Sequence, residues 1–240
     1  MVKVRDKILQ DTKKRIKDTK KKIENTRKKI NSIEYDAHWY RRVFHAFGAC
    51  LLFYYLLPNE DWVNVLKFWV PPLMVITIIA VEILRLKGKV SSDHFFGLRM
   101  YEQKRIGSYV FFAIAFLILI RFFPQQIAIP CILCACISDP IIGEIRHRFG
   151  MKHVYVFGFL ISMIFFMVAW YKTDIRLMIL ASIIGSIGAV VGETKKFWWL
   201  DDDFMIQMVP AVLLLIIWIA IPYLGLSHPD PVIYPSVWPW

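Results

Sequence analysis

Apolar stretches alternate with two kinds of polar link in this chain of 240 residues. Short, nearly neutral links alternate with longer links rich in Arg, Lys, Asp and Glu. A helix needs about 20 mostly apolar residues to cross a membrane. We therefore predict an all-α polytopic integral membrane protein with about seven transmembrane helices. The predicted spans are 43–57, 62–84, 108–123, 127–142, 154–170, 177–192 and 204–226.

A seven-residue repeat precedes these spans: DTKKRIK at 11–17, DTKKKIE at 18–24 and NTRKKIN at 25–31. The repeat puts Ile16, Ile23 and Ile30 on one side of a basic amphipathic helix, at coiled-coil spacing. We expect this helix to pair with its copy in a homodimer. The open alternatives are binding along a surface of anionic lipid and a solvated charged helix. The predicted domains are this helix at 1–36, a transmembrane catalytic domain at 37–226 and a Pro/Trp-rich tail at 227–240.

Composition agrees with a membrane protein, since 57% of the residues are hydrophobic, 20% are charged and the mean hydropathy is +0.48. The net charge of +11 is uneven, because residues 1–34 carry +8 of it. A basic segment outside the bilayer indicates attraction to anionic membrane lipids. Nucleic acid is the poorer expectation, and we predict no nucleic-acid partner. Little of the chain remains for a separate soluble domain, so any chemistry must come from helix ends and short loops.

The charged links should all emerge on one face of the membrane. The link at 85–107 contains six Lys and Arg residues, whereas the three opposite links at 58–61, 121–126 and 171–176 contain three between them. Basic loops remain in the cytoplasm. This pattern predicts a cytoplasmic N-terminus, a C-terminus on the opposite side and a cytoplasmic active site. The membrane would be the plasma membrane in a prokaryote or the endoplasmic reticulum in a eukaryote.

Arginine and histidine mark the first charged cluster. Arg41, Arg42 and His45 lie at the mouth of the first span, with Arg41 and His45 on one helical face. A guanidinium pair binds phosphate and an imidazole moves a proton at neutral pH. Simple snorkelling at the boundary is the structural alternative. The second cluster pairs Glu82 with Arg85 at the end of the second span and then places acidic and basic groups at three-residue spacing: Arg99, Glu102 and Arg105.

Acidic residues mark the third and fourth clusters. Asp139 is followed by Pro140 within an apolar run, so we expect the fourth helix to break there and to form a cation site. Glu193 ends the sixth span, and Asp201, Asp202 and Asp203 open the seventh. A helix N-terminus favours acidic residues, but three in a row exceed that need, so metal binding is the better interpretation. Arginine for phosphate and carboxylates for Mg²⁺ are typical of phosphoryl or nucleotidyl transfer.

Five segments in order resemble the dolichol kinase and phytol kinase family, within a broader group of membrane cytidylyltransferases. They are RRVFHAFG at 41–48, EILRL at 82–86, LRMYEQKRIGSY at 98–109, SDPIIGEIRHRFG at 138–150, and Glu193 followed by LDDDF at 200–204. The chain departs from the family pattern at Glu144, Arg146 and Asp203. The resemblance covers roughly residues 38–215. It implies a kinase that transfers the γ-phosphate of CTP to a membrane-embedded isoprenoid alcohol of the dolichol or polyprenol type.

The clusters and the resemblance together give each candidate residue a role. His45 or a nearby carboxylate such as Glu102 would take the hydroxyl proton, and Asp139 would act in catalysis. The expected Mg²⁺ ligands are Asp139, Glu193, Asp201 and Asp202. The expected nucleotide and phosphate contacts are Arg41, Arg42, Arg85, Arg99, Arg105 and Arg148. The alternatives are a membrane cytidylyltransferase that makes a CDP-activated lipid and, less favoured because the midspan positions carry almost no charge, a transporter.

Overall fold

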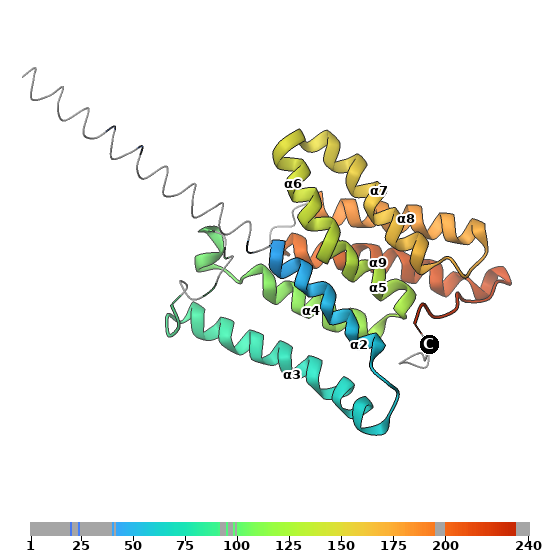
Figure 1. Ribbon diagram of the computed structural model, residues 1–240, viewed down its shortest axis with the longest axis horizontal. Helices are drawn as coiled ribbons and strands as arrows, with labels where there is room; N and C mark the ends of the chain where they lie inside the picture. Colours follow the sequence, from blue (N-terminus) through green and yellow to red (C-terminus); the bar gives the residue numbers. More distant parts are fainter. Residues whose placement is uncertain are drawn as a thin grey trace, which may run out of the picture.

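The computed structural model describes residues 20, 24, 40, 42–91, 95, 98, 100–194 and 200–233 (Figure 1). Every regular element in these ranges is helical, which confirms the predicted all-α class. Among them, five helices are long and apolar enough to cross a membrane, as expected for a membrane-embedded protein. They are α3 (Asp61–Leu86), the continuous helix Gln125–Phe149, α7 (Met151–Ala169), α8 (Ile175–Thr194) and α9 (Asp202–Ala220).

The predicted first and third spans correspond to shorter apolar helices, Arg42–Leu56 and α4 (Ser108–Phe122). The first ends in the 3₁₀ turn η1 (Ala49–Leu52) and α2 (Phe53–Leu56), while η3 (Met100–Lys104) precedes α4 and η5 (Pro222–Leu224) follows α9. Five of the seven predicted spans therefore correspond to helices long enough to cross a membrane, and the total of seven stays a prediction. The predicted basic helix and its homodimer lie outside the described residues, apart from Lys20 and Glu24.

The predicted break of the fourth helix at Asp139 is wrong. Helix α5 (Gln125–Leu133) continues through the π-helical turn η4 (Cys134–Ser138) into α6 (Asp139–Phe149). Pro140 lacks the N–H that would continue the backbone hydrogen bonds, but the carbonyl of Ala135 accepts a hydrogen bond from the His45 side chain instead. The helix therefore stays continuous, and the local change is a widened turn. Such π turns are frequent at functional sites.

Small residues bring α8 and α9 together at backbone distance. A Cβ atom built on Gly188 would lie 2.8 Å from the Cα of Pro210, and one built on Gly192 would lie 2.4 Å from the carbonyl oxygen of Met205. The two glycines are four residues apart, the spacing that lets membrane helices approach closely. Their contact fixes Glu193, the next residue along α8, beside the beginning of α9.

The core lies among α4, α5, α7, α8 and α9, with Phe166 and Trp170 fully buried within it. In contrast, α3 packs mainly on α4, and only 17% of its apolar 18-residue stretch is buried within the protein. In Figure 1, α3 runs along the lower edge of the bundle, apart from α7 and α8. This peripheral position leaves the groove beside α3 that is described below.

The end of the bundle opposite the charged links is held by two glutamines of α5. Gln125 exchanges hydrogen bonds with the backbone of Ile233, and Gln126 donates to the carbonyl oxygen of Pro229 at 2.7 Å. These contacts attach the described part of the tail, up to residue 233, to the helices. The predicted tail is therefore irregular in this part and is packed on α5.

Candidate functional site

The charged links emerge at one end of the bundle. In Figure 1, the beginning of Arg42–Leu56, the end of α3 and the beginnings of α4 and α9 lie at the left, together with the α6–α7 junction. The sequence prediction that the clusters share one face agrees with this arrangement. Side chains from three of these clusters meet in one group: the ligand atoms of His45, Asp139 and Asp203 lie within 4.8 Å of one another. We call these three residues the His–Asp centre.

His45 is held by a backbone carbonyl of the π turn. Its Nδ1 lies 2.9 Å from the carbonyl oxygen of Ala135, and because a carbonyl only accepts, Nδ1 carries the proton and donates. In the neutral ring, Nε2 is then an acceptor, and it lies 3.5 Å from Oδ1 of Asp203. Asp139 approaches the ring from the other side, with Oδ2 3.7 Å from Nδ1. The ring is 8% exposed, so a proton acceptor is enclosed between two carboxylates.

Pro140 explains why the Ala135 carbonyl is available to His45. In the π turn, the N–H of Asp139 donates to the carbonyl oxygen of Cys134, five residues earlier. The corresponding donor for Ala135 would be residue 140, but proline has no N–H. The carbonyl of Ala135 therefore accepts from the His45 side chain instead. The Asp-Pro pair thus supplies both a carboxylate of the centre and the acceptor that orients its imidazole.

Asp203 is the most deeply buried acid of the site, at 1% exposure. Asp201 is the N-cap of α9, and its side chain accepts from the N–H of Asp202 at 3.0 Å, where a negative charge is favoured by the helix N-terminus. Asp203 instead shares the buried face of α9 with Ile206, Gln207 and Pro210. The predicted ligands Asp201 and Asp202 are near Asp203, and the three carboxylates have oxygens within 4.8 Å of one another. The structure therefore adds Asp203, which the sequence prediction omitted from the ligand set.

Glu193 of α8 lies in the same region as Asp139, Asp201, Asp202 and Asp203, and we call these five residues the acidic centre. It is 3% exposed, and the charges of Asp139 and Asp202 act on it. Oε1 receives a hydrogen bond from Arg146, while Oε2 is buried with no hydrogen-bond partner among the described residues. Crowded carboxylates repel one another unless a proton or a cation lies between them. Asp203 thus belongs to two groups of carboxylates, one with Asp139 and one with the predicted ligands Asp201 and Asp202. The predicted ligand Glu193 lies beside Asp139 and Asp202.

Arg85 holds a loop and does not face the acidic centre, contrary to its predicted phosphate role. Its guanidinium pairs with Glu82 through Nε and NH2, each at 2.7 Å. It also donates to the carbonyl oxygens of Gln103 at 3.1 Å and Arg105 at 2.6 Å. These protein acceptors occupy the guanidinium at 3% exposure. Arg85 therefore positions the turn that carries Glu102.

Glu82 completes this support by binding the beginning of α4. It accepts from the N–H of Gly107 at 2.6 Å and from the hydroxyl of Tyr109. The sequence prediction that Glu82 needs Arg85 as a partner is confirmed, since the two form a buried ion pair. Glu102 is 2% exposed and lines the groove described next. The predicted catalytic carboxylate is therefore at the site, held there by a buried ion pair behind it.

The remaining arginines lie at the rim. Arg42 pairs with Glu144 at 2.5 Å, and Arg148 pairs with the same carboxylate from one turn along α6. Arg105 is exposed. The phosphate role of these three arginines stays a prediction. The predicted phosphate contacts Arg41 and Arg99 lie outside the described residues.

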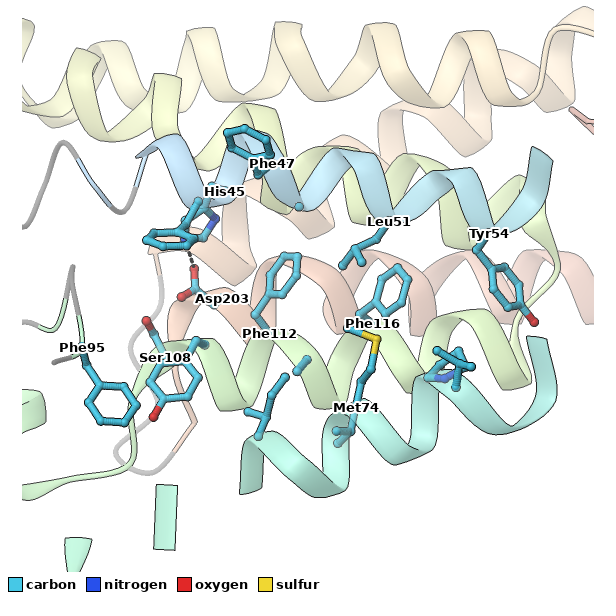
Figure 2. A pocket seen from close by; sticks show the side chains of 18 of the residues that line it. His45, Phe47, Leu51, Tyr54, Met74, Phe95, Ser108, Phe112, Phe116 and Asp203 are labelled. Carbon is cyan, nitrogen blue, oxygen red and sulfur yellow. Dashed lines mark ion pairs between the residues drawn. The ribbon is translucent and has the colours of Figure 1, made fainter. Parts of the chain in front are cut away.

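An apolar groove of about 820 Å³ begins at the His–Asp centre. It runs between Arg42–Leu56, α3 and α4, and Figure 2 shows His45 and Asp203 at one end and Tyr54 at the other. The polar residues at the first end are His45, Glu102, Ser108, Tyr109 and Asp203. Leu51, Met74, Phe112 and Phe116 line its length. The groove therefore suits a molecule with a small polar head and a long apolar chain.

Two features of the site had signals in the sequence that the prediction did not use. Asp203 lies three, four and seven residues before the buried residues of α9, which is the spacing of one helical face. Gly188 and Gly192 form a G-x-x-x-G pair that predicts close helix packing beside Glu193. The groove had no comparable signal, because it is formed by helices that are distant in sequence.

Comparisons of this chain with protein-family models, with curated proteins and with solved structures give no match. The resemblance to the dolichol and phytol kinases therefore rests on the five sequence segments alone.

Proposed function

We propose that this protein is a CTP-dependent lipid-alcohol kinase that phosphorylates an isoprenoid alcohol of the dolichol or polyprenol type at the cytoplasmic membrane surface. The observation that carries the proposal is the junction between the apolar groove and the His–Asp centre. A lipid hydroxyl at this junction would meet a proton acceptor, while its chain would lie along apolar side chains. The choice of CTP and of an isoprenoid comes from the family resemblance.

The acidic centre fits Mg²⁺ by the chemistry of its donors. Carboxylate oxygens are the ligands that Mg²⁺ prefers, and it commonly uses one or two of them together with nucleotide phosphates. Glu193 offers a buried oxygen without a hydrogen-bond partner among the described residues, next to Asp139 and Asp202. Asp139 and Asp203, with Glu193 beside them, would hold the ion. When bound, Mg²⁺ neutralises phosphate charge and polarises the transferred group.

The residues of the chain itself would orient and deprotonate the alcohol. Nε2 of His45 is the acceptor of the neutral ring, and His45 lines the end of the groove, so it would take the hydroxyl proton. The alcohol oxygen forms a bond with the γ-phosphorus as the bond to the β-phosphate oxygen breaks. CDP leaves with that electron pair. Asp203, 3.5 Å from Nε2, would stabilise the imidazolium that forms, and the proton would pass to solvent afterwards.

The rim arginines would hold the nucleotide from the aqueous side. Arg42 and Arg148 share Glu144, so phosphate oxygens compete with one carboxylate for two guanidinium groups. Arginine binds phosphate in a bidentate manner and stays charged at neutral pH. A nucleotide from solution and an alcohol from the bilayer would thus meet at one centre from opposite directions.

The experiment that tests the proposal follows the label from CTP into lipid. Purified protein in nanodiscs receives Mg²⁺, geranylgeraniol and CTP labelled at either the γ- or the α-phosphate. The kinase transfers the γ-label to the lipid and releases CDP. A parallel mixture contains phosphatidate in place of the alcohol. Transfer of the α-label to phosphatidate, with release of pyrophosphate from CTP, would contradict the kinase and favour the cytidylyltransferase. Absence of either transfer would contradict both reactions.

A further inference from the structure

The apolar wall of the groove is bounded by polar groups at both ends. One end is the His–Asp centre, and the other is marked by Lys67, which is only 4% exposed. The Lys67 ammonium donates to the carbonyl oxygens of Leu57 at 2.6 Å and Pro58 at 3.3 Å. It thereby ties the turn after Arg42–Leu56 to α3. A hydrocarbon chain gains nothing by packing on this ammonium and these carbonyls, so the apolar contact surface ends here.

The distance between these two ends follows from helix geometry. On α3, the lining residues run from Leu66 to Ile78, which at about 1.5 Å per residue corresponds to about 18 Å. On the facing segment, the lining from His45 at the His–Asp centre to Leu57 also corresponds to about 18 Å. Carbon–carbon bonds of about 1.5 Å advance an extended chain by about 1.25 Å per carbon. The groove thus matches roughly 14 chain carbons, or between three and four isoprene units.

The groove is also open along its side. Leu66, Val70 and Met74 line it from α3 and are each between 41% and 49% exposed. A chain longer than the groove can therefore turn away from Lys67 and continue in the bilayer. The bilayer is as apolar as the groove, so only the part that packs against the wall contributes to recognition.

We propose that this groove is a chain-length gauge, which recognises the first three to four isoprene units of the lipid alcohol and is indifferent to units beyond them. The inference rests on the proposed function, since the hydroxyl at the His–Asp centre sets the start of the measured length. The lipid chain moves from the apolar bilayer into a groove that is also apolar. Each isoprene unit up to the limit therefore gains only van der Waals packing against the groove wall. We expect about a threefold gain in affinity per unit, and none after the limit.

Binding without nucleotide tests the gauge directly. Full-length protein in nanodiscs is labelled with a photoactivatable analogue of geranylgeraniol, and geraniol, farnesol, geranylgeraniol and a long polyprenol compete for it. Affinity should rise through geranylgeraniol and then level off. Affinity that keeps rising to the long polyprenol, or that is equal across the series, would overturn the gauge. Equal competition by a phospholipid would overturn it as well, because the groove would then accept any bilayer chain.

A bulky residue halfway along the groove should shorten the gauge. Met74→Trp places an indole in the middle of the lining of α3, and Ala113→Leu narrows the same region from α4. Both should leave geraniol affinity within about twofold and remove the advantage of geranylgeraniol, about a tenfold loss for the two further units. The matched control is Ile76→Trp, whose side chain is 61% exposed and does not line the groove. An unchanged length profile in both groove variants would overturn the proposal.

The gauge and the kinase can fail separately. Phosphorylation of every alcohol in the series with equal efficiency would overturn the gauge and leave the kinase reaction standing. Binding that levels off at geranylgeraniol, with no phosphate transferred to it, would support the gauge and contradict the kinase.

Discussion

Asp203→Asn removes one negative charge from the His–Asp centre and preserves the size of the side chain. In the structure, Oδ1 of Asp203 lies 3.5 Å from Nε2 of His45. Two unit charges at this separation interact by about 5 kcal/mol at an effective dielectric constant of about 20. This interaction arises only when His45 has accepted the hydroxyl proton, so its loss raises the barrier to reaction. An Asn oxygen is also a weaker ligand for the proposed Mg²⁺ than a carboxylate. Since Asp139 retains part of the stabilisation, we expect turnover to fall on the order of a hundredfold to a thousandfold.

The assay is the initial rate of γ-label transfer from CTP to geranylgeraniol, at saturating Mg²⁺ and nucleotide. The matched control is Asp230→Asn, the same substitution at an exposed residue on the opposite end of the bundle. It should retain the activity of the unaltered protein. Turnover of Asp203→Asn within about threefold of the unaltered protein would refute the reasoning, because losing an interaction of several kcal/mol in the transition state must lower the rate by far more than threefold.

Thermal unfolding separates chemistry from folding in this variant. Asp203 is 1% exposed near other carboxylates, so removing its charge relieves repulsion and desolvation in the folded protein. We expect Tm to remain unchanged or to rise, as happens when functional residues are replaced at strained sites. A fall in Tm of many degrees would mean that Asp203 supports the fold, and would contradict its assignment to the reaction.

Three further predictions address orientation of the imidazole, helix packing and topology. Pro140→Ala restores an N–H that competes with His45 for the carbonyl of Ala135, so turnover should fall about fivefold and the ¹⁵N signals that report the imidazole tautomer should change. The control Pro130→Ala should change neither. The same altered spectrum in both variants would contradict the role of Pro140 in orienting His45. Gly192→Val places a side chain against the α9 backbone, where even a Cβ would lie 2.4 Å away, so Tm should fall markedly; an unchanged Tm would contradict the close packing. In a background without the native cysteines, a cysteine at Lys172 should react with an impermeant reagent in sealed cells and one at Lys152 should not; the reverse labelling would overturn the orientation.

The sequence predicted the helices well because apolar stretches of sufficient length are a strong local signal. Helix bounds came within a few residues for α4, α7 and α8. The joining of α5 and α6 was missed, because Pro140 after Asp139 was interpreted as a break. Whether a proline breaks a helix depends on whether the hydrogen bond lost with its N–H is replaced. Here the replacement comes from His45, about ninety residues from Ala135 in sequence.

The site was predicted by residue type, and only in part by geometry. Charge segregation indicated correctly that the acidic and basic links share one end of the bundle. It could not separate side chains that face the centre from those that support it. Arg85 and Arg42 are both arginines at a helix end, yet one is enclosed by backbone carbonyls and the other pairs with Glu144 at the rim. Such differences follow from tertiary contacts, which a single sequence does not contain.

Phosphorus NMR of a single reaction mixture tests the central claim most directly. Protein in nanodiscs, Mg²⁺, CTP and geranylgeraniol should yield CDP and a lipid phosphomonoester in equal amounts, with neither formed when the alcohol is omitted. Pyrophosphate together with a lipid that carries the CMP group of CTP would contradict the kinase. CDP with inorganic phosphate in place of the phosphomonoester would also contradict it, since the nucleophile at the His–Asp centre would then be water and not the lipid hydroxyl.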